Sequence, residues 1–542
     1  MTSRTGDAAA TAPLTILGHP RGLFLLFAVE MWERFSYYGM RALLIFYLTK
    51  HFLFDDARAN LAYGAYTSLV YLTPVVGGWT ADRWLGGRKA VLFGGALIAI
   101  GHGCLAVEGG IGGTDGRAIG MFFLGLAFVI VGTGFLKANI SAIVGTLYPR
   151  DDARRDPAYT IFYMGLNTGA LLGALACGWL GERVGWFWGF GAAGLGMLIG
   201  LAVFVAFKRD LLGRSEPPDP AWLRTRIAGL SREAWIYGGG VMSVILAWLL
   251  VQHQALVGTL LAVAGLPLIA YVLWIAMRAL PPVERDRILA AVALIVGSIL
   301  FWALFEQAGS SINLYTDRDV DRSLFGWTVP ASMYQSINSF WIILLAPLMA
   351  ALWTWTGRRG WEPSAPAKFG LGLIQLGFGF LVLVWGARAN AGALTPTLYI
   401  VLLYMLHSTG ELCLSPVGLS AMTKMALPQM AGLLMGTWFF AMSAGDFLAG
   451  LIASTTGGGG GGGSEATISI YAEVGWVGIG VGTVFLFVAP FLKRLMHLDT
   501  LGENGAALSD GPTIGRSDNA AFRRHANGRI ASTEEAEPRL RL

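Results

Sequence analysis

The chain has 542 residues, of which 55% are hydrophobic and 13% are charged. Because the charged share is about half that of a soluble domain, this composition excludes a soluble protein and indicates an integral membrane protein. The formal net charge of +5 comes from loops and the tail, so we expect no nucleic-acid partner. Cys104, Cys177 and Cys413 are scattered, and we expect neither disulfides nor a metal site.

Hydropathy predicts fourteen membrane-spanning helices in the order six, two and six. The first six are expected near residues 22–49, 61–81, 90–108, 119–147, 159–182 and 186–207. The central pair is expected near 234–252 and 255–277, and because its one potentially charged group is His253, we expect it at the periphery. The last six are expected near 288–313, 325–355, 369–388, 395–424, 429–455 and 467–494.

The distribution of basic residues predicts the orientation. With the N-terminus inside, the inner segments before the C-terminal tail contain 21 Lys and Arg and the outer loops contain 7. The positive-inside rule therefore places both termini in the cytoplasm. We expect a cytoplasmic N-terminus (1–21), a six-helix bundle (22–207), a basic linker (208–233), two additional helices (234–277), a short linker (278–287), a second six-helix bundle (288–498) and a disordered cytoplasmic tail (499–542).

Two segments outside these helices have a distinctive composition. Residues 1–21 are polar and small, and the apolar run after them is too long for a signal peptide, so no cleavable signal is expected. Residues 457–463 are seven consecutive glycines, which predict a flexible coil in the last outer loop.

The first predicted span contains the charged sequence Glu30-Met31-Trp32-Glu33-Arg34-Phe35-Ser36-Tyr37-Tyr38-Gly39-Met40-Arg41. A charged group at the centre of a span costs roughly 2.5–3.5 kcal/mol on insertion scales. Glu30 and Arg34 reduce this cost as an i,i+4 pair. Arg34, Tyr38 and Arg41 share one helix face. That face must therefore meet a wet cavity or the protein interior; the alternative is a structural ion-pair cluster between helices.

Polar residues continue in the later spans. Lys137 lies deep in the fourth span, where a lysine needs a counter-charge or water, and Asn167 follows in the fifth. The intramembrane charges are five acids and three bases: Glu30, Glu33, Glu306, Glu411 and Asp446 against Arg34, Arg41 and Lys137. At least two carboxyl groups thus lack a permanent partner, which favours proton coupling. His407, four residues before Glu411, is either a packing group or part of this system.

Several motifs carry a resemblance to a known family. Glu-x-x-Glu-Arg-Phe-x-Tyr-Tyr-Gly at residues 30–39 resembles the first-helix motif of proton-dependent oligopeptide transporters, a branch of the major facilitator superfamily. Segments 132–141 and 162–170 resemble signature stretches of the same family. The loop sequence at 77–89 resembles the superfamily's cytoplasmic loop motif, for which we expect a conformational latch involving Asp82. The second span has no histidine, so the resemblance is to the bacterial branch.

The resemblance implies a major facilitator fold of two six-helix bundles with two extra helices, and a role for each matching residue. Glu30, Glu33 and Arg34 match the proton-coupling triad; Arg41 and Glu306 match an outer-gate salt bridge, and Lys137 and Glu411 a second pair between the halves. Arg34 and Lys137 match the family residues that bind the peptide carboxylate. The residues that match those binding the peptide ammonium group are Asn167, Asn338 and Glu411. The residues that match the walls of the side-chain pockets are Tyr37, Tyr38, Tyr71, Trp302 and Trp438. Asp446 departs from the family pattern, in which asparagine is expected.

The resemblance therefore implies a proton-coupled symporter that imports di- and tripeptides by alternating access, without a cofactor. Its expected partners are these peptides, protons and the lipid bilayer, and it is expected to be a monomer in the plasma (inner) membrane. A related transporter of nitrate, a drug or another small solute is an alternative, as is a substrate sensor without turnover. An enzyme is disfavoured, since the sequence contains no nucleophile–base–acid set, metal-ligand cluster or phosphate loop.

Overall fold

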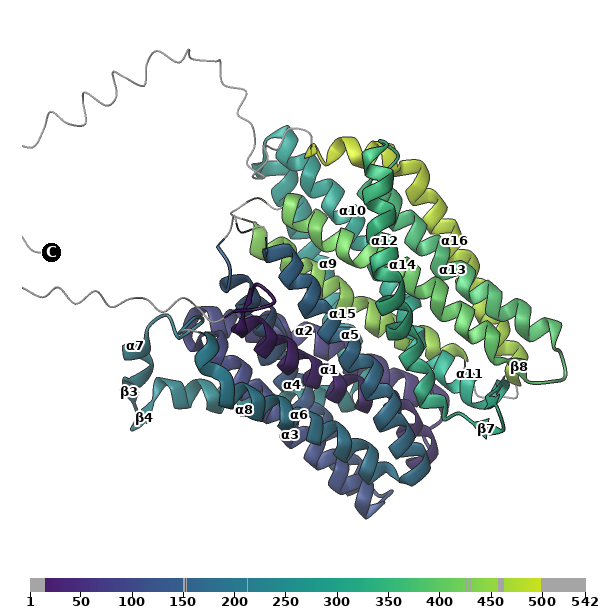
Figure 1. The fold of residues 1–542 in the computed structure, drawn as a ribbon, viewed down its shortest axis with the longest axis horizontal. Coiled ribbons are helices and arrows are strands. Elements are labelled where there is room, and N and C mark those ends of the chain that lie inside the picture. The colour runs from purple at the N-terminus through teal and green to yellow at the C-terminus, as the bar shows by residue number, and fades with distance from the viewer. Residues whose placement is uncertain are drawn as a thin grey trace, which may run out of the picture. The chain divides into compact units, whose positions relative to one another are not determined.

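The computed structural model describes residues 15–149, 152, 154–211, 213–425, 427, 430–456 and 463–498. Within these residues, fourteen helices have 21 residues or more, joined by helical turns and two-residue strands (Figure 1). The tail at 499–542 and the glycine run lie outside the described part, apart from Gly463 at the start of the last helix. The predicted coil and disordered tail therefore stay predictions.

The first half of the chain forms six long helices, several of which have identifiable end signals. Asp55 and Asp115 are N-caps whose carboxylates accept hydrogen bonds of 2.9 Å from the backbone N–H groups of Arg58 and Ala118. A single π-helical turn extends three of the helices: η1 (Tyr47–His51), η2 (Ala81–Leu85) and η3 (Leu180–Val184). The six helices are α1 (Arg21–Phe46), α2 (Asp56–Thr80), α3 (Gly87–Ile111), α4 (Gly116–Thr146), α5 (Arg155–Trp179) and α6 (Trp186–Phe207).

The second half forms six more long helices and differs from the predicted spans at two places. A 3₁₀ turn, η5 (Glu306–Gly309), interrupts the span predicted at 288–313, and the span predicted at 325–355 begins only at η6 (Ala331–Gln335). Residues 323–328 form a short antiparallel hairpin instead, with its turn at Phe325 and Gly326, where Gly326 has a φ of +79°, and Pro330 directly precedes η6. The six long helices are α10 (Pro282–Phe305), α12 (Ser336–Arg358), α13 (Ala365–Ala389), α14 (Thr397–Met425), α15 (Ala431–Thr456) and α16 (Gly463–Leu495), and the short helix α11 (Ser311–Asp319) lies between α10 and α12.

Short elements complete the described chain. The turn η4 (Lys208–Leu211) and the helix α7 (Pro220–Arg224) lie in the segment between α6 and α8. Four pairs of two-residue strands tie loops together: β1 (Thr15–Ile16) with β2 (His19–Pro20), β3 (Arg226–Ile227) with β4 (Leu230–Ser231), β5 (Val320–Asp321) with β8 (Thr395–Pro396), and β6 (Ser323–Leu324) with β7 (Trp327–Thr328). These strands leave the architecture all-α.

Glycines allow helix backbones to touch within each half. A Cβ on Gly101 of α3 would lie 2.6 Å from the carbonyl oxygen of Gly125 on α4. In the second half, a Cβ on Gly482 of α16 would lie 2.6 Å from the carbonyl oxygen of Gly370 on α13. Close backbone approach is the usual basis of helix packing in membranes, where lipid supplies no hydrophobic driving force between helices.

The two additional helices, α8 (Arg232–Gln252) and α9 (Gln254–Ala279), pack on the outside of the bundles. Helix α8 contacts α4 and α2, and α9 contacts α10 and α15. Aromatic rings of the bundles fit against glycines of the pair, with Phe93 at Gly240 and Phe440 at Gly265. The opposite faces are exposed and apolar, through residues such as Met242, Leu246, Val263 and Leu266. The pair is therefore peripheral.

Twelve helices in the described residues are long and apolar enough to cross a membrane. Helices α1 and α2 have similar lengths but are not among the twelve. Helix α1 contains five charged residues, including the motif at residues 30–41. The prediction of fourteen spans thus depends on these two helices and stays a prediction.

The loop motif at 77–89 makes close contacts with the segment after α6. Gly86 has a φ of +73°, and a Cβ there would lie 2.5 Å from the backbone of Glu216 and Pro217. Arg88 forms an ion pair with Glu216, and Lys89 lies 2.5 Å from Glu233 at the start of α8. Asp82 is exposed and makes no ion pair within the described residues. The charged contacts of this loop thus come from Arg88 and Lys89 rather than from Asp82.

Candidate functional site

The charged motif of α1 is buried and contains one cation for two acids. Arg34 Nε donates a hydrogen bond of 2.7 Å to Glu30 Oε1 and lies 3.2 Å from Glu33 Oε2. All three side chains are at most 4% exposed. The second contact is too poorly aligned for a hydrogen bond, and both Glu33 oxygens are without one. One guanidinium can neutralise one carboxylate, so the triad has room for a proton.

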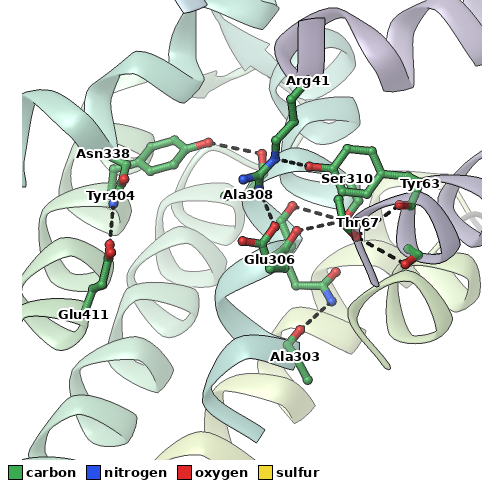
Figure 2. A network of polar contacts seen from close by, with 12 residues as sticks. Arg41, Tyr63, Thr67, Ala303, Glu306, Ala308, Ser310, Asn338, Tyr404 and Glu411 are labelled. Carbon is green, nitrogen blue, oxygen red and sulfur yellow. Dashed lines mark hydrogen bonds and ion pairs between the residues drawn. The ribbon is translucent and has the colours of Figure 1, made fainter. Parts of the chain in front are cut away.

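Arg41 joins the two halves. Its Nη2 forms an ion pair with Glu306 Oε2, and its Nε donates a hydrogen bond of 2.5 Å to the hydroxyl of Tyr63 on α2 (Figure 2). Arg41 and Glu306 are 5% and 2% exposed. The helix break η5 places Glu306 in this position, and Ser310 Oγ donates 3.2 Å back to the Glu306 carbonyl. A buried ion pair of this kind holds both helices strongly, because separating it leaves an uncompensated charge.

Further contacts join the halves toward one end of the bundles, which we call the closed end: the ends of η1 and α11 and the start of α2. Lys50 Nζ lies 2.8 Å from Asp317 Oδ2, and Arg318 donates two hydrogen bonds to Asp56. Deeper in the molecule, Ser68 Oγ and Ser443 Oγ lie 2.9 Å apart. As far as the described residues show, the hydrogen bonds and ion pairs between the halves lie between these serines and the closed end.

Backbone contact accompanies these polar contacts at the seam between α2 and α15. A Cβ on Gly64 would lie 2.7 Å from the Cα of Gly450, which is closer than real side chains approach. Asn60 Nδ2 donates 3.0 Å to the carbonyl of Ala453, one turn further along the same seam. The two halves are thus closed against each other from Ser443 to the closed end.

Glu411 and Asn338 lie together in the second half. Asn338 Nδ2 donates a hydrogen bond of 3.3 Å to Glu411 Oε2 (Figure 2). It also donates one of 2.9 Å to Ser408 Oγ. His407 is fully buried, with its ring 5.0 Å from that of Phe380 and 6.3 Å from that of Phe305. Its surroundings favour the packing interpretation of His407.

Lys137 does not form the pair with Glu411 that the family resemblance implies. Its Nζ lies 3.5 Å from the centre of the Tyr71 ring, and no ion pair of Lys137 occurs within the described residues. Glu411 is bonded instead to Asn338 within its own half. Lys137 and Glu411 belong to different halves, and each has its nearest polar or aromatic contact within its own half.

Most of the remaining predicted site residues have little exposed surface and do not line an open pocket. Asn167 donates 3.1 Å to the carbonyl of Tyr163 on its own helix. Tyr37 is 1% exposed with its hydroxyl unbonded, and Tyr38 meets it edge-on at 5.2 Å. Trp302 and Trp438 are 6% and 3% exposed, and Trp438 packs edge-on to Phe369. The structure thus brings Arg41 and Glu306 together, and Asn338 and Glu411, but leaves the aromatic residues within helix packing.

Three polar residues near these groups were not predicted. Tyr63 holds Arg41, and Gln307 Nε2 donates 3.0 Å to the carbonyl of Ala449 on α15. Glu108 is 1% exposed on α3 and accepts a hydrogen bond from Tyr47. Gln307 directly follows Glu306 within an apolar run, and this polar pair could have identified Gln307 from the sequence. Glu108 could have been identified as an acidic residue at the edge of a predicted span. Nothing in the sequence distinguishes Tyr63 from other aromatic residues.

Two sets of long helices, joined by the buried ion pair of Arg41 with Glu306, form an all-α membrane transporter of the major facilitator fold. A sequence profile described as the POT family matches residues 88–461, which is more than half of the chain. The chain belongs to the POT family. This confirms the predicted family and fold, and a transporter rather than an enzyme.

Similar proteins match nearly the full chain. The chain is 36% identical over 511 residues to the peptide transporter YePEPT of Yersinia enterocolitica, covering 91% of this chain and 98% of the relative. It is 34% identical to a di-/tripeptide transporter of Lactococcus lactis subsp. lactis, covering 89% and 97%. Among solved structures, the peptide transporter POT in complex with sulfate is similar with a TM-score of 0.77 and 34% identity, covering 90% of this chain and 98% of that chain.

Proposed function

We propose that this chain is a proton-coupled symporter that imports di- and tripeptides by alternating access. The observation that carries the proposal is the buried ion pair between Arg41 and Glu306, which joins the two halves where α10 breaks into η5. A titratable carboxyl group at this position couples the contact between the halves to the binding of a proton. The names of the relatives, a peptide transporter and a di-/tripeptide transporter, support the substrate class.

Protonation of Glu306 removes the charge that holds Arg41, so it releases the closed end. The triad on α1 supplies a second place for a proton, because Arg34 neutralises one of its two glutamates. Each proton that moves inward contributes about 2.3 kcal/mol per 100 mV of membrane potential, in addition to any pH gradient. Protons alone drive the cycle, and no cofactor is required.

The proposed peptide site binds both termini of the substrate. Arg34 and Lys137 in the first half bind the carboxylate, and Asn167, Asn338 and Glu411 bind the ammonium group. Tyr37, Tyr38, Tyr71, Trp302 and Trp438 are the proposed walls for side chains. Charges of opposite sign on the two halves measure the distance between the peptide termini, so selectivity for length is tight and selectivity for side chains is broad. A substrate that contacts both halves favours closure around itself, since differential contacts shift a two-state equilibrium.

The proposed arrangement in the membrane has fourteen spans, grouped as six, two and six, with both termini in the cytoplasm. The bundles comprise residues 22–207 and 288–498, with the additional pair at 234–277. The closed end then faces the outside of a plasma (inner) membrane, and the structure corresponds to an inward-facing state. The exposed outer faces of α8 and α9 meet lipid in a monomeric transporter.

Uptake of labelled dialanine into proteoliposomes tests the proposal. With an inward proton gradient, we expect dialanine to accumulate above its external concentration, and a protonophore abolishes the accumulation. Tripeptides compete, whereas nitrate and drug panels do not. Binding of dialanine without accumulation would favour a sensor, and accumulation of nitrate or a drug instead would favour the related transporter.

A further inference from the structure

Asp446 is a buried carboxyl group at the seam of α2 and α15 to which the proposed function assigns no role. It is 2% exposed, and its Oδ2 has no hydrogen-bond partner. A Cβ on Gly64 would lie 3.2 Å from the Asp446 carbonyl oxygen. Ser443, three residues before Asp446, contacts Ser68, so the seam is closed on both sides of Asp446. Separation of α2 from α15 exposes this carboxyl group.

The gate lies beside Asp446. Gln307, the neighbour of Glu306, donates its hydrogen bond to Ala449, three residues beyond Asp446 on α15. The groups that interact electrostatically with Asp446 are Glu306, Arg41, Lys137, Tyr63 and Tyr71, which belong to η5, α1, α4 and α2. On the other helices packed against α15, several ionisable groups are engaged elsewhere: Glu411 with Asn338, Asp317 with Lys50, Arg318 with Asp56, and Tyr471 against the rings of Tyr315 and Phe380.

The two cations of the described residues that interact with Asp446 have other contacts in this state. Arg41 is paired with Glu306, and Lys137 lies over the Tyr71 ring. Within the described residues, Asp446 makes no ion pair, and an ionised carboxylate buried without a partner is strongly unfavourable. The carboxyl group therefore holds a proton while the seam is closed.

We propose that Asp446 is a second proton-binding group of the gate, which must be protonated for the outer side to close. Its linkage is opposite to that of Glu306, because the closed state contains an ionised Glu306 paired with Arg41 and a neutral Asp446. Acid thus favours closure through Asp446 and opposes closure through Glu306. The proposal rests on the alternating-access part of the proposed function and is independent of the substrate.

Spin labels on the two halves measure closure directly. Cysteines introduced as Leu53→Cys and Phe325→Cys, both at exposed positions near the closed end, report the closed-to-open ratio from their distance distribution in nanodiscs, without peptide. In a Glu306→Gln background, we expect the closed-to-open ratio to fall as the pH rises, by up to tenfold per pH unit, because Asp446 ionises. Adding Asp446→Asn makes the ratio independent of pH, and Asp446→Glu restores the dependence.

Equal pH dependence in Glu306→Gln with and without Asp446→Asn would overturn the proposal, since a purely structural role shifts the ratio equally at every pH. If the double variant does not fold, Asp446→Asn with Glu306 intact decides the matter. Its closed-to-open ratio must rise with pH more steeply than that of the wild type, and an unchanged slope contradicts the proposal. Distances that never change in any variant would contradict alternating access itself, whereas failed dialanine uptake would contradict only the substrate assignment.

Discussion

At the scale of single residues, the α1 triad concentrates two acids around one base. Arg34 is the one cation bonded to Glu30, and it also lies nearest to Glu33. Removal of the shared partner of a buried ion pair costs about 3–5 kcal/mol, because the charge left behind has no compensation. We therefore expect the triad to stabilise the folded protein, besides the proton-binding role that we propose for it.

This asymmetry predicts different effects for two substitutions in the triad. Arg34→Ala lowers the free energy of unfolding by about 3–5 kcal/mol, whereas Glu33→Gln retains the hydrogen bond between Arg34 and Glu30 and has a much smaller effect. Thermal unfolding in detergent, followed by tryptophan fluorescence, measures both. Equal losses for the two variants would contradict the unequal sharing of Arg34.

The hydrogen bond between Tyr63 and Arg41 leads to a second prediction, which concerns the closed-to-open ratio. A hydrogen bond to a charged group contributes about 1.5–3 kcal/mol, so Tyr63→Phe lowers the closed-to-open ratio by about tenfold or more. Tyr66→Phe is the matched control, because the hydroxyl of Tyr66 is buried on the same helix without a partner. The spin labels at positions 53 and 325 measure both variants. A similar shift in the two would show that Tyr63 does not act through Arg41.

Asp152 provides a control for pH dependence outside the membrane. Hydrogen bonds from Arg154 lower the pKa of Asp152 to about 2. A carboxyl group with a lowered pKa loses its charge only as the pH falls through that value, so Asp152 stays ionised between about pH 5 and pH 8. Asp152→Asn therefore leaves the pH profile of dialanine uptake unchanged, and a shifted profile would place part of the pH dependence in this loop.

Local residue patterns could be predicted from the sequence, whereas partners from distant helices could not. The i,i+4 spacing of Glu30 and Arg34 predicts their hydrogen bond, because helix geometry alone brings them together. The partner of Arg41 is 265 positions away, and only the family resemblance indicated Glu306. The same resemblance implied a pair of Lys137 with Glu411 that this state does not contain, since such pairs depend on the conformation.

At the scale of elements, the break of α10 at Glu306 is the feature that hydropathy could not predict. Residues 301–314 remain apolar enough to continue a span, and the interruption shows only in the polar run from Glu306 to Ser311. The 3₁₀ turn redirects the chain and places Glu306 toward Arg41 and Gln307 toward α15. Backbone irregularity at membrane depth is tolerated where protein surrounds it, as here.

The contact of Gly64 with Gly450 predicts the effect of a larger residue at the seam. Gly64→Val forces α2 and α15 apart at the closed end, so we expect a lower closed-to-open ratio and a lower rate of uptake. Gly103→Val on α3 is the control, because a Cβ at Gly103 meets nothing within 4 Å. Spin-label distances and dialanine uptake measure both. Uptake reduced equally by both substitutions would indicate a general folding defect rather than a seam effect.

At the scale of the whole molecule, the charged contacts divide according to where they act. Glu30 and Arg34 stay within α1, Glu411 and Asn338 stay within the second half, and Arg41 with Glu306 bridges the halves. The first two sets can keep their geometry while the halves move, but the bridge must break for the outer side to open. We therefore assign the coupling of protons to conformation chiefly to Glu306.

The most direct test of this central claim compares two transport modes of Glu306→Gln in proteoliposomes. Glutamine retains the size of the side chain but can neither ionise nor form the ion pair with Arg41. We predict that gradient-driven accumulation of dialanine is lost in Glu306→Gln, whereas counterflow exchange, which needs no net proton movement, survives. Gradient-driven accumulation equal to that of the wild type would contradict the account, because the bridge between the halves would then have no part in proton coupling.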